Sequence, residues 1–260
     1  MKLPYYFTLY SFLLLFNCSP VQNLHSGHHV NGVSFVSPSE KINPDLIIIP
    51  KKRINANWLC FMPYGFIKNN STAIGFDQDW QWWGERSDGI LELIKMAKDS
   101  SYQIMLKPHI WIQKGNYTGH LEFQDEEEWI NFEQSYEGYI LHFAKIAEEN
   151  KIEIFCIGTE WEKFVEVRQH FWINLIDKVR DIYSGKLTYA SNWDEFKTTP
   201  FWQKLDYIGI NAYFPVSADK TPSIEEVKEN LTPIKDNMLS FSDSLNKQVI
   251  FTEYGYRSVD

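Results

Sequence analysis

Two glutamates each stand at the end of a short apolar run. Glu160 comes two residues after the run 152–158, and Glu253 comes directly after the run 249–252. A carboxylate at the end of a buried segment is unfavourable unless it is paired or used. One such glutamate is more often a capping or ion-pairing residue, but two of them, with aromatic residues beside them, favour catalytic chemistry.

Two carboxyl groups can divide the work of a hydrolysis between them. In retaining cleavage of glycosidic bonds one is the acid/base, the other is the nucleophile, and they lie about 5–5.5 Å apart. Their surroundings must push the two pKa values apart, because one keeps its proton and the other must be ionised. We therefore expect Glu160 and Glu253 to be catalytic, with Lys107, His109 or Tyr213 stabilising an ionised Glu253.

Other polar and aromatic residues follow the remaining apolar runs. Aromatic residues make up 16% of the chain, and core packing is the better explanation for any single one. Aromatic faces also pack on the C–H faces of sugar rings, so those at strand ends are candidates for substrate binding. These candidates are Tyr64, Trp83, Lys107, His109, Trp111, Asn192, Trp193 and Tyr213.

The elements that must position these residues are seven short apolar runs separated by longer amphipathic stretches. Several runs are almost wholly apolar, as in strands buried on both faces. Alternation of strands and helices predicts an α/β fold with a parallel sheet, and in (β/α)8 barrels the functional residues stand at the carboxyl ends of the strands. About 90 residues separate the two glutamates, which is the length of three βα units of about 30 residues each. The runs are 33–36, 57–62, 104–107, 152–158, 187–190, 207–212 and 249–252.

The stretches between the runs predict the helices. We expect helices over 88–100, 126–150, 162–183 and 223–245, a short helix over 197–204, and broken structure over 38–54, which contains Pro44 and Pro50. Seven strands predict a (β/α)8 TIM barrel over residues 32–260 that lacks its last βα unit in this chain.

The N-terminus has the pattern of an export signal. Lys2 precedes an apolar run that ends before Cys18, where a lipoprotein signal would place its lipidated cysteine. We expect residues 1–18 to be a lipoprotein-type signal peptide and 19–31 to be a linker, so that the protein is exported and anchored in the periplasm or at the cell surface. An uncleaved anchor helix is the alternative.

Charge and cysteine content indicate which classes of binding partner the sequence favours. The 260-residue chain has a formal net charge of −9, which disfavours nucleic acids and anionic membrane surfaces and suits a neutral polysaccharide. We expect a monomer that needs no cofactor. We also expect no metal site, because no Cys/His cluster has metal-ligand spacing. Cys60 and Cys156 lie in separate apolar runs and are expected to be buried thiols.

Ordered motifs run through most of the chain and together resemble glycoside hydrolase family 113. They are GVSF at 32–35, NWLCFMPYGF at 57–66, WWGE at 82–85, KPHIW at 107–111, IGTEW at 157–161, SNW at 191–193, INAYFP at 210–215 and TEYGYRS at 252–258. The resemblance implies a retaining TIM-barrel β-1,4-mannanase, with the acid/base after strand four and the nucleophile after strand seven.

Residue roles follow from this resemblance. It implies that Glu160 is the acid/base, that Glu253 is the nucleophile and that Tyr213 hydrogen-bonds the nucleophile. It places four further residues in sugar subsites, namely His109, Trp111, Asn192 and Trp193.

The chain departs from the pattern of the wider clan in three places. Thr159 stands where many relatives have an asparagine, Lys107 would have to replace a missing arginine, and an eighth strand is not seen in the sequence. The alternative function is a non-catalytic, glycan-binding surface lipoprotein on the same scaffold. Retention of both glutamates argues against it.

Overall fold

The computed structural model describes residues 29–68 and 71–256. The predicted signal peptide, Cys18 and most of the predicted linker lie outside the described residues, as do the last four positions. All elements belong to the compact unit Asn31–Asp260. In the described part of this unit, no helix is both long and apolar enough to cross a membrane.

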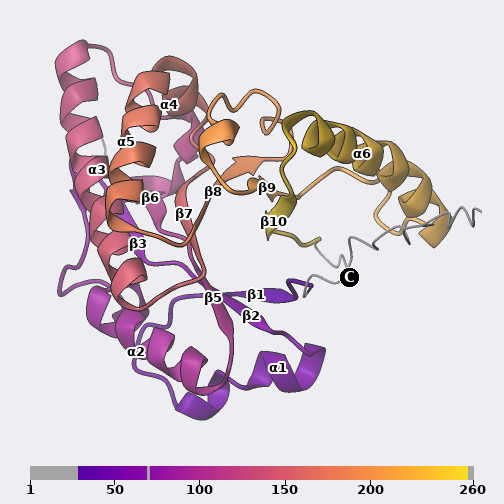
Figure 1. Cartoon of the computed structure of the whole chain (residues 1–260), viewed down its shortest axis with the longest axis horizontal. Coiled ribbons are helices and arrows are strands. Elements are labelled where there is room, and N and C mark those ends of the chain that lie inside the picture. The colour runs from indigo at the N-terminus through magenta and orange to yellow at the C-terminus, as the bar shows by residue number, and fades with distance from the viewer. Residues whose placement is uncertain (1–28, 69–70, 257–260) are drawn as a thin grey trace, which may run out of the picture. The chain divides into compact units, whose positions relative to one another are not determined.

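Seven parallel strands form a nearly closed barrel wall (Figure 1). Each strand pairs with the next in the order β1-β2-β5-β7-β8-β9-β10, and neither β1 nor β10 has a second partner among the described strands. This confirms the predicted TIM-barrel fold with seven strands. The strands are β1 (Gly32–Phe35), β2 (Trp58–Phe61), β5 (Gln103–Leu106), β7 (Ile154–Thr159), β8 (Lys186–Asn192), β9 (Ile208–Asn211) and β10 (Val249–Glu253).

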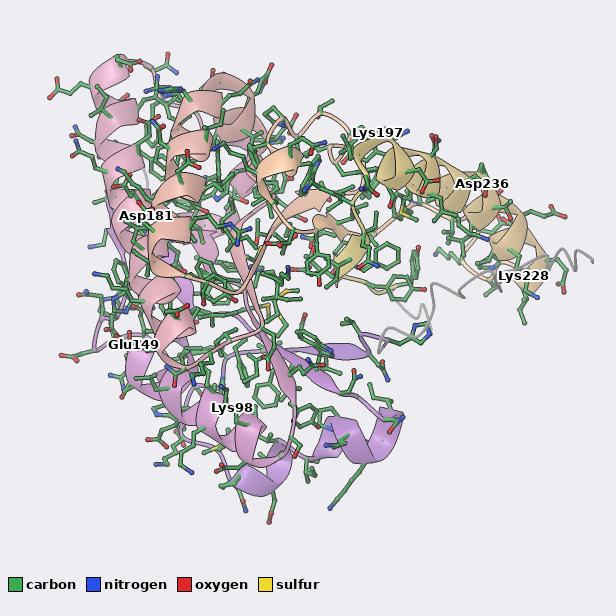
Figure 2. All side chains as sticks on the ribbon, viewed as in Figure 1. Lys98, Glu149, Asp181, Lys197, Lys228 and Asp236 are labelled. Carbon is green, nitrogen blue, oxygen red and sulfur yellow. The ribbon has the colours of Figure 1, made fainter. Side chains whose placement is uncertain are left out.

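Helices cover the outer side of this sheet, and α3 and α5 stand beside one another in Figure 1. Charged side chains such as Lys98, Glu149 and Asp181 point outward from the helices (Figure 2). Their other faces bury aromatic and aliphatic side chains against the strands, which is the pattern of amphipathic helices. The helices are α1 (Ile49–Ile54), α2 (Ser87–Asp99), α3 (Glu126–Glu149), α4 (Glu162–Val167), α5 (Gln169–Ile182) and α6 (Ile224–Leu245).

The helix predictions need two corrections. The stretch 162–183 is two helices, because the backbone of Arg168 is not helical; its guanidinium forms ion pairs with Glu126 and Glu133 of α3. The expected short helix over 197–204 is reduced to the 3-10 turn Trp202–Lys204. The region 38–54 is broken as predicted, into the 3-10 turn Pro44–Leu46 and α1.

A second, small sheet was not predicted. It has the order β4-β3-β6, with β3 (Tyr64–Ile67), β4 (Ile74–Gly75) and β6 (His109–Ile112). β3 and β6 follow β2 and β5 after two residues each, so this sheet extends beyond the carboxyl ends of two barrel strands.

The core has two parts. A small cluster, which includes Trp58, Met105 and Ile250, consists mainly of side chains from the barrel strands. The large cluster packs the helices against the outer face of the strands. Both predicted thiols, Cys60 and Cys156, are free and buried, and burial raises the pKa of Cys60 to about 12.

Candidate active site

Glu160 stands directly after β7 in a backbone conformation that glutamate seldom adopts. Its φ is +53°, in the left-handed region. Three hydrogen bonds hold this turn: Glu160 N–H donates to Ala190 O (2.9 Å), Thr118 Oγ1 donates to Glu160 O (3.4 Å), and Trp161 N–H donates to the hydroxyl of Tyr189 (2.8 Å). Local strain that the surroundings enforce in this way is concentrated at functional sites.

The carboxyl group of Glu160 is anchored by Asn211 at the end of β9. Asn211 Nδ2 donates to Glu160 Oε1 at 2.8 Å, and its own Oδ1 accepts a 2.7 Å hydrogen bond from Thr252 Oγ1. Burial raises the pKa of Glu160, the Asn211 hydrogen bond opposes this, and the charge of Glu253 adds to the rise. Glu160 is thus suited to keep its proton.

Glu253, the last residue of β10, has the opposite environment. Lys107 Nζ lies 2.5 Å from Glu253 Oε1, and the hydroxyl of Tyr213 donates to Oε2 at 2.7 Å. Burial alone would raise the pKa of Glu253, but the Lys107 charge, with help from Tyr213, lowers it below its ordinary value. Glu253 is thus suited to be ionised.

Lys107 is fully buried and has no contact with water. Burial alone would lower the pKa of its ammonium group, but interactions with Cys60 and with the carboxylate of Glu253 raise it. Lys107 Nζ also donates to Thr252 O at 3.2 Å. The expectation that Lys107 supplies the positive charge beside Glu253 therefore agrees with this geometry.

His109 lies beside the same carboxylate without pairing with it. Its Nε2 is 3.7 Å from Glu253 Oε1, but burial and the Lys107 charge lower the pKa of His109 to about 3, so the ring is neutral. That Nε2 is buried and has no hydrogen-bond partner within the described ranges. A buried polar atom without a hydrogen-bond partner is energetically unfavourable. His109 Nε2 is therefore available to a hydroxyl group of a bound molecule.

A register irregularity precedes each of the two glutamates. β10 carries one extra residue relative to β9 between Phe251 and Glu253, and β7 carries one relative to β8 between Cys156 and Thr159. Such bulges re-aim side chains next to active sites. They explain how two strands of buried, alternating side chains end in carboxylates that face a common site.

A third carboxyl group, Glu195, lies near the acid/base candidate. Asn192 Nδ2 donates to the hydroxyl of Tyr117 at 3.0 Å, and that hydroxyl donates weakly to Glu195 Oε1 at 3.5 Å. Burial raises the pKa of Glu195 to about 7, and the carboxylates of Glu162, Asp194 and Glu160 add to the rise.

Sequence reasoning did not identify Asn211, Tyr117 and Glu195. Asn211 lies in the motif INAYFP at 210–215 and ends a buried strand. That position could have identified it as a site residue. Tyr117 lies in a loop, and nothing in the sequence connects it with residues about 80 positions later.

The aromatic candidates are placed in different surroundings. The ring of Tyr64 contacts that of His109 with centroids 5.4 Å apart, and Trp111 is half exposed on β6. Trp193 is partly buried, packs on the core and contacts Phe214 (6.0 Å between centroids). Trp83 packs against the core and beside Gly89, so its role in substrate binding stays a prediction without support from its packing.

Metal chemistry has no candidate in this part of the chain. Residues 29–68 and 71–256 contain no group of three or more His, Cys, Asp or Glu side chains that could hold a metal ion. The titratable groups that do converge are carboxyl groups with a buried lysine, a set suited to acid–base and nucleophilic chemistry.

Comparison with known proteins gives a consistent result. The sequence profile described as Glycoside Hydrolase Family 113 matches residues 41–260. No curated protein matches the sequence.

Solved structures share the fold at low sequence identity. The GH113 β-mannanase AaManA from Alicyclobacillus acidocaldarius has a TM-score of 0.74 at 20% identity, with 85% of this chain and 69% of that chain covered. A GH113 β-1,4-mannanase in a complex has a TM-score of 0.70 at 23% identity, with 85% and 71% covered. A structure described with two fungal β-1,4-galactanases has a TM-score of 0.52 at 14% identity. It covers 84% of this chain, and 71% of that chain is covered.

Proposed function

The chain belongs to glycoside hydrolase family 113, and from this premise we propose that it is a retaining, endo-acting hydrolase of β-1,4-linked mannan or a related β-glycan. Glu160 is the acid/base and Glu253 is the nucleophile. The observation that carries the proposal is the opposite tuning of the two groups: the pKa of Glu160 is raised, and that of Glu253 is lowered. The two roles require this division.

The reaction proceeds in two displacements. In the first, a carboxylate oxygen of Glu253 bonds to the anomeric carbon, while Glu160 transfers its proton to the oxygen of the departing sugar. In the second, Glu160 takes a proton from water, the water oxygen bonds to the anomeric carbon, and the ester bond to Glu253 breaks. Proton and charge are restored at the end of the cycle.

The buried cation has a different effect in each displacement. Formation of the glycosyl ester removes the charge of Glu253 and leaves Lys107 unpaired in a site without water contact. A buried, unpaired charge is unfavourable, so Lys107 favours departure of Glu253 as a carboxylate. Lys107 thereby opposes accumulation of the covalent intermediate.

Chemical rescue tests the assignment. With an activated aryl β-mannoside and azide, Glu160→Ala is expected to form a glycosyl azide of retained configuration, because azide enters in the second displacement without base assistance. Glu253→Ala is expected to form the inverted azide, because azide replaces the nucleophile. Glu149→Gln, a change at the exposed end of α3, is the control and should match the parent.

The substrate is tested with mannan, glucomannan, xylan, cellulose and β-1,4-galactan. Mannan or glucomannan as the best substrate, with internal cleavage products, supports the proposal. Normal turnover by Glu160→Ala without azide, or a preference for galactan, would contradict it. In the second candidate function, that of a non-catalytic glycan-binding protein, every substrate binds and none is cleaved.

We also propose that the protein acts as an exported monomer anchored by a lipid on Cys18. The support is the sequence pattern of residues 1–18. Expression of the full chain in a bacterium with radiolabelled palmitate should label the protein, and Cys18→Ser should abolish the label. Equal labelling of both forms would exclude Cys18 as the acceptor.

A further inference from the structure

The small sheet β4-β3-β6 has two chemically different faces. One face is buried and aliphatic, with Ile67, Ile74 and Ile112 all less than one-tenth exposed. On β3, Tyr64 and Phe66 alternate with its buried residues and are half-buried. In the parallel register Phe66 pairs with Trp111, and cross-strand partners share a face. The second face is therefore aromatic and open to solvent.

The aromatic face is continuous with the proposed active site. From Glu253 the contacts lead to the His109 ring, from His109 to Tyr64 (centroids 5.4 Å apart), and from Tyr64 to Phe66 (6.3 Å). Phe66 in turn packs edge-to-face against Trp80, with centroids 4.9 Å apart. The rings thus form a row that begins at the nucleophile.

The outer two rings are more than half exposed, unlike the tryptophans of the core. Trp161 and Trp172 are almost completely buried, whereas Trp80 is 61% exposed and Trp111 is 52% exposed. Large apolar side chains that remain exposed as a group mark binding surfaces.

The supporting loops hold these rings in place before any ligand arrives. Gln81 Nε2 donates to Tyr64 O at 2.8 Å and its Oε1 accepts from Gln78 N–H at 2.9 Å, so the loop that carries Trp80 is tied to β3. Trp111 rests beside Gly115, whose φ of +70° closes the turn after β6. Rigid aromatic rings lose little conformational freedom on binding, which favours affinity.

From these observations we propose that Tyr64, Phe66, Trp80 and Trp111 form a binding platform for neutral β-linked pyranose units of the same glycan chain, beyond the sugar that Glu253 attacks. The apolar C–H faces of such rings pack on aromatic faces, and their hydroxyl groups remain in water. The platform rests on the proposed function, and it makes the enzyme selective for long chains over short ones.

Kinetics on two substrates test the platform in the full chain. For Trp80→Ala and Trp111→Ala, kcat/KM on mannohexaose is expected to fall about tenfold more than kcat/KM on an aryl β-mannoside, mostly through KM, because only the long substrate reaches the platform. Trp80→Phe, which keeps an aromatic face, should recover most of the loss. Trp82→Ala removes a neighbouring exposed tryptophan and is the matched control. Equal losses on the two substrates, or no loss on the hexaose, would overturn the platform.

Binding measurements separate failure of the platform from failure of the proposed function. Glu160→Gln is titrated calorimetrically with mannohexaose, cellohexaose and xylohexaose, and Trp80→Ala is added in the same background. An approximately tenfold weaker Kd supports the platform even when azide rescue fails and the protein proves non-catalytic. Unchanged affinity, or no binding of any hexaose, refutes the platform even when rescue succeeds.

Discussion

The Lys107–Glu253 pair sets the charge state of the site. Glu253 has a lower pKa in the folded protein than in the unfolded chain, so the pair stabilises the fold above the unfolded pKa of Glu253, and this stabilisation is lost as pH falls through the folded pKa. Lys107 has a raised pKa, so its contribution is present below its unfolded pKa and is lost as pH rises through the folded one. Between these limits both charges are present.

Removal of the cation is expected to change both stability and pH dependence. Lys107→Met leaves Glu253 buried without its partner, which costs about 3–5 kcal/mol. The acid limb of kcat/KM against pH should move to higher pH, because Glu253 becomes harder to ionise, and kcat/KM should fall about 10²-fold or more. Urea unfolding and a pH–rate profile measure the two effects, and an unmoved acid limb would contradict the role of Lys107.

Glu195 is expected to influence the basic limb of kcat/KM against pH, whereas Lys107 influences the acid limb. It titrates near pH 7, and when ionised it disfavours loss of the proton from Glu160. Asp194, Glu162, Tyr117 and Asn192 also face it. Glu195→Gln removes one negative charge, so the pKa of Glu160 should fall and the basic limb of kcat/KM should move to lower pH. Glu149→Gln is the control and should leave the pH profile unchanged. An unchanged profile for Glu195→Gln would show that Glu195 and Glu160 are not coupled.

At the scale of elements, the two bulges show what sequence reasoning can predict. Apolar runs predicted seven strands and the position of each glutamate after its strand, because burial on both faces leaves a strong pattern. The extra residue in β7 and in β10 leaves no such pattern, since it depends on the register with the neighbouring strand. The left-handed φ of Glu160 was equally unpredictable, because glycine or asparagine would be expected there.

The small sheet and the α4/α5 break escaped prediction for related reasons. β3 and β6 have four residues each and follow barrel strands after only two residues, so the sequence pattern placed them in the loops after the runs 57–62 and 104–107. The break at Arg168 has no proline or glycine to announce it. It coincides with ion pairs to Glu126 and Glu133, about 40 positions earlier in the chain.

At the scale of the whole molecule, fold and family were predictable because evidence for them is spread over many motifs. The prediction of a (β/α)8 barrel and of family 113 is confirmed by a profile match over 41–260 and by solved mannanases with TM-scores of 0.70 and 0.74. The hydrogen-bond network of the site was less predictable. Asn211, Thr252 and Tyr117 act through contacts between strands and loops that only the folded chain creates.

The long separation between Lys107 and Glu253 has a consequence for synthesis of the protein. The two residues are 146 positions apart, and Glu253 lies in β10, the last of the described barrel strands. While the ribosome is still adding the residues before β10, Lys107 has no counterion, and closing the barrel around an uncompensated ammonium group is unfavourable. The packing around Lys107 can therefore be completed only after the nucleophile itself has emerged from the ribosomal exit tunnel.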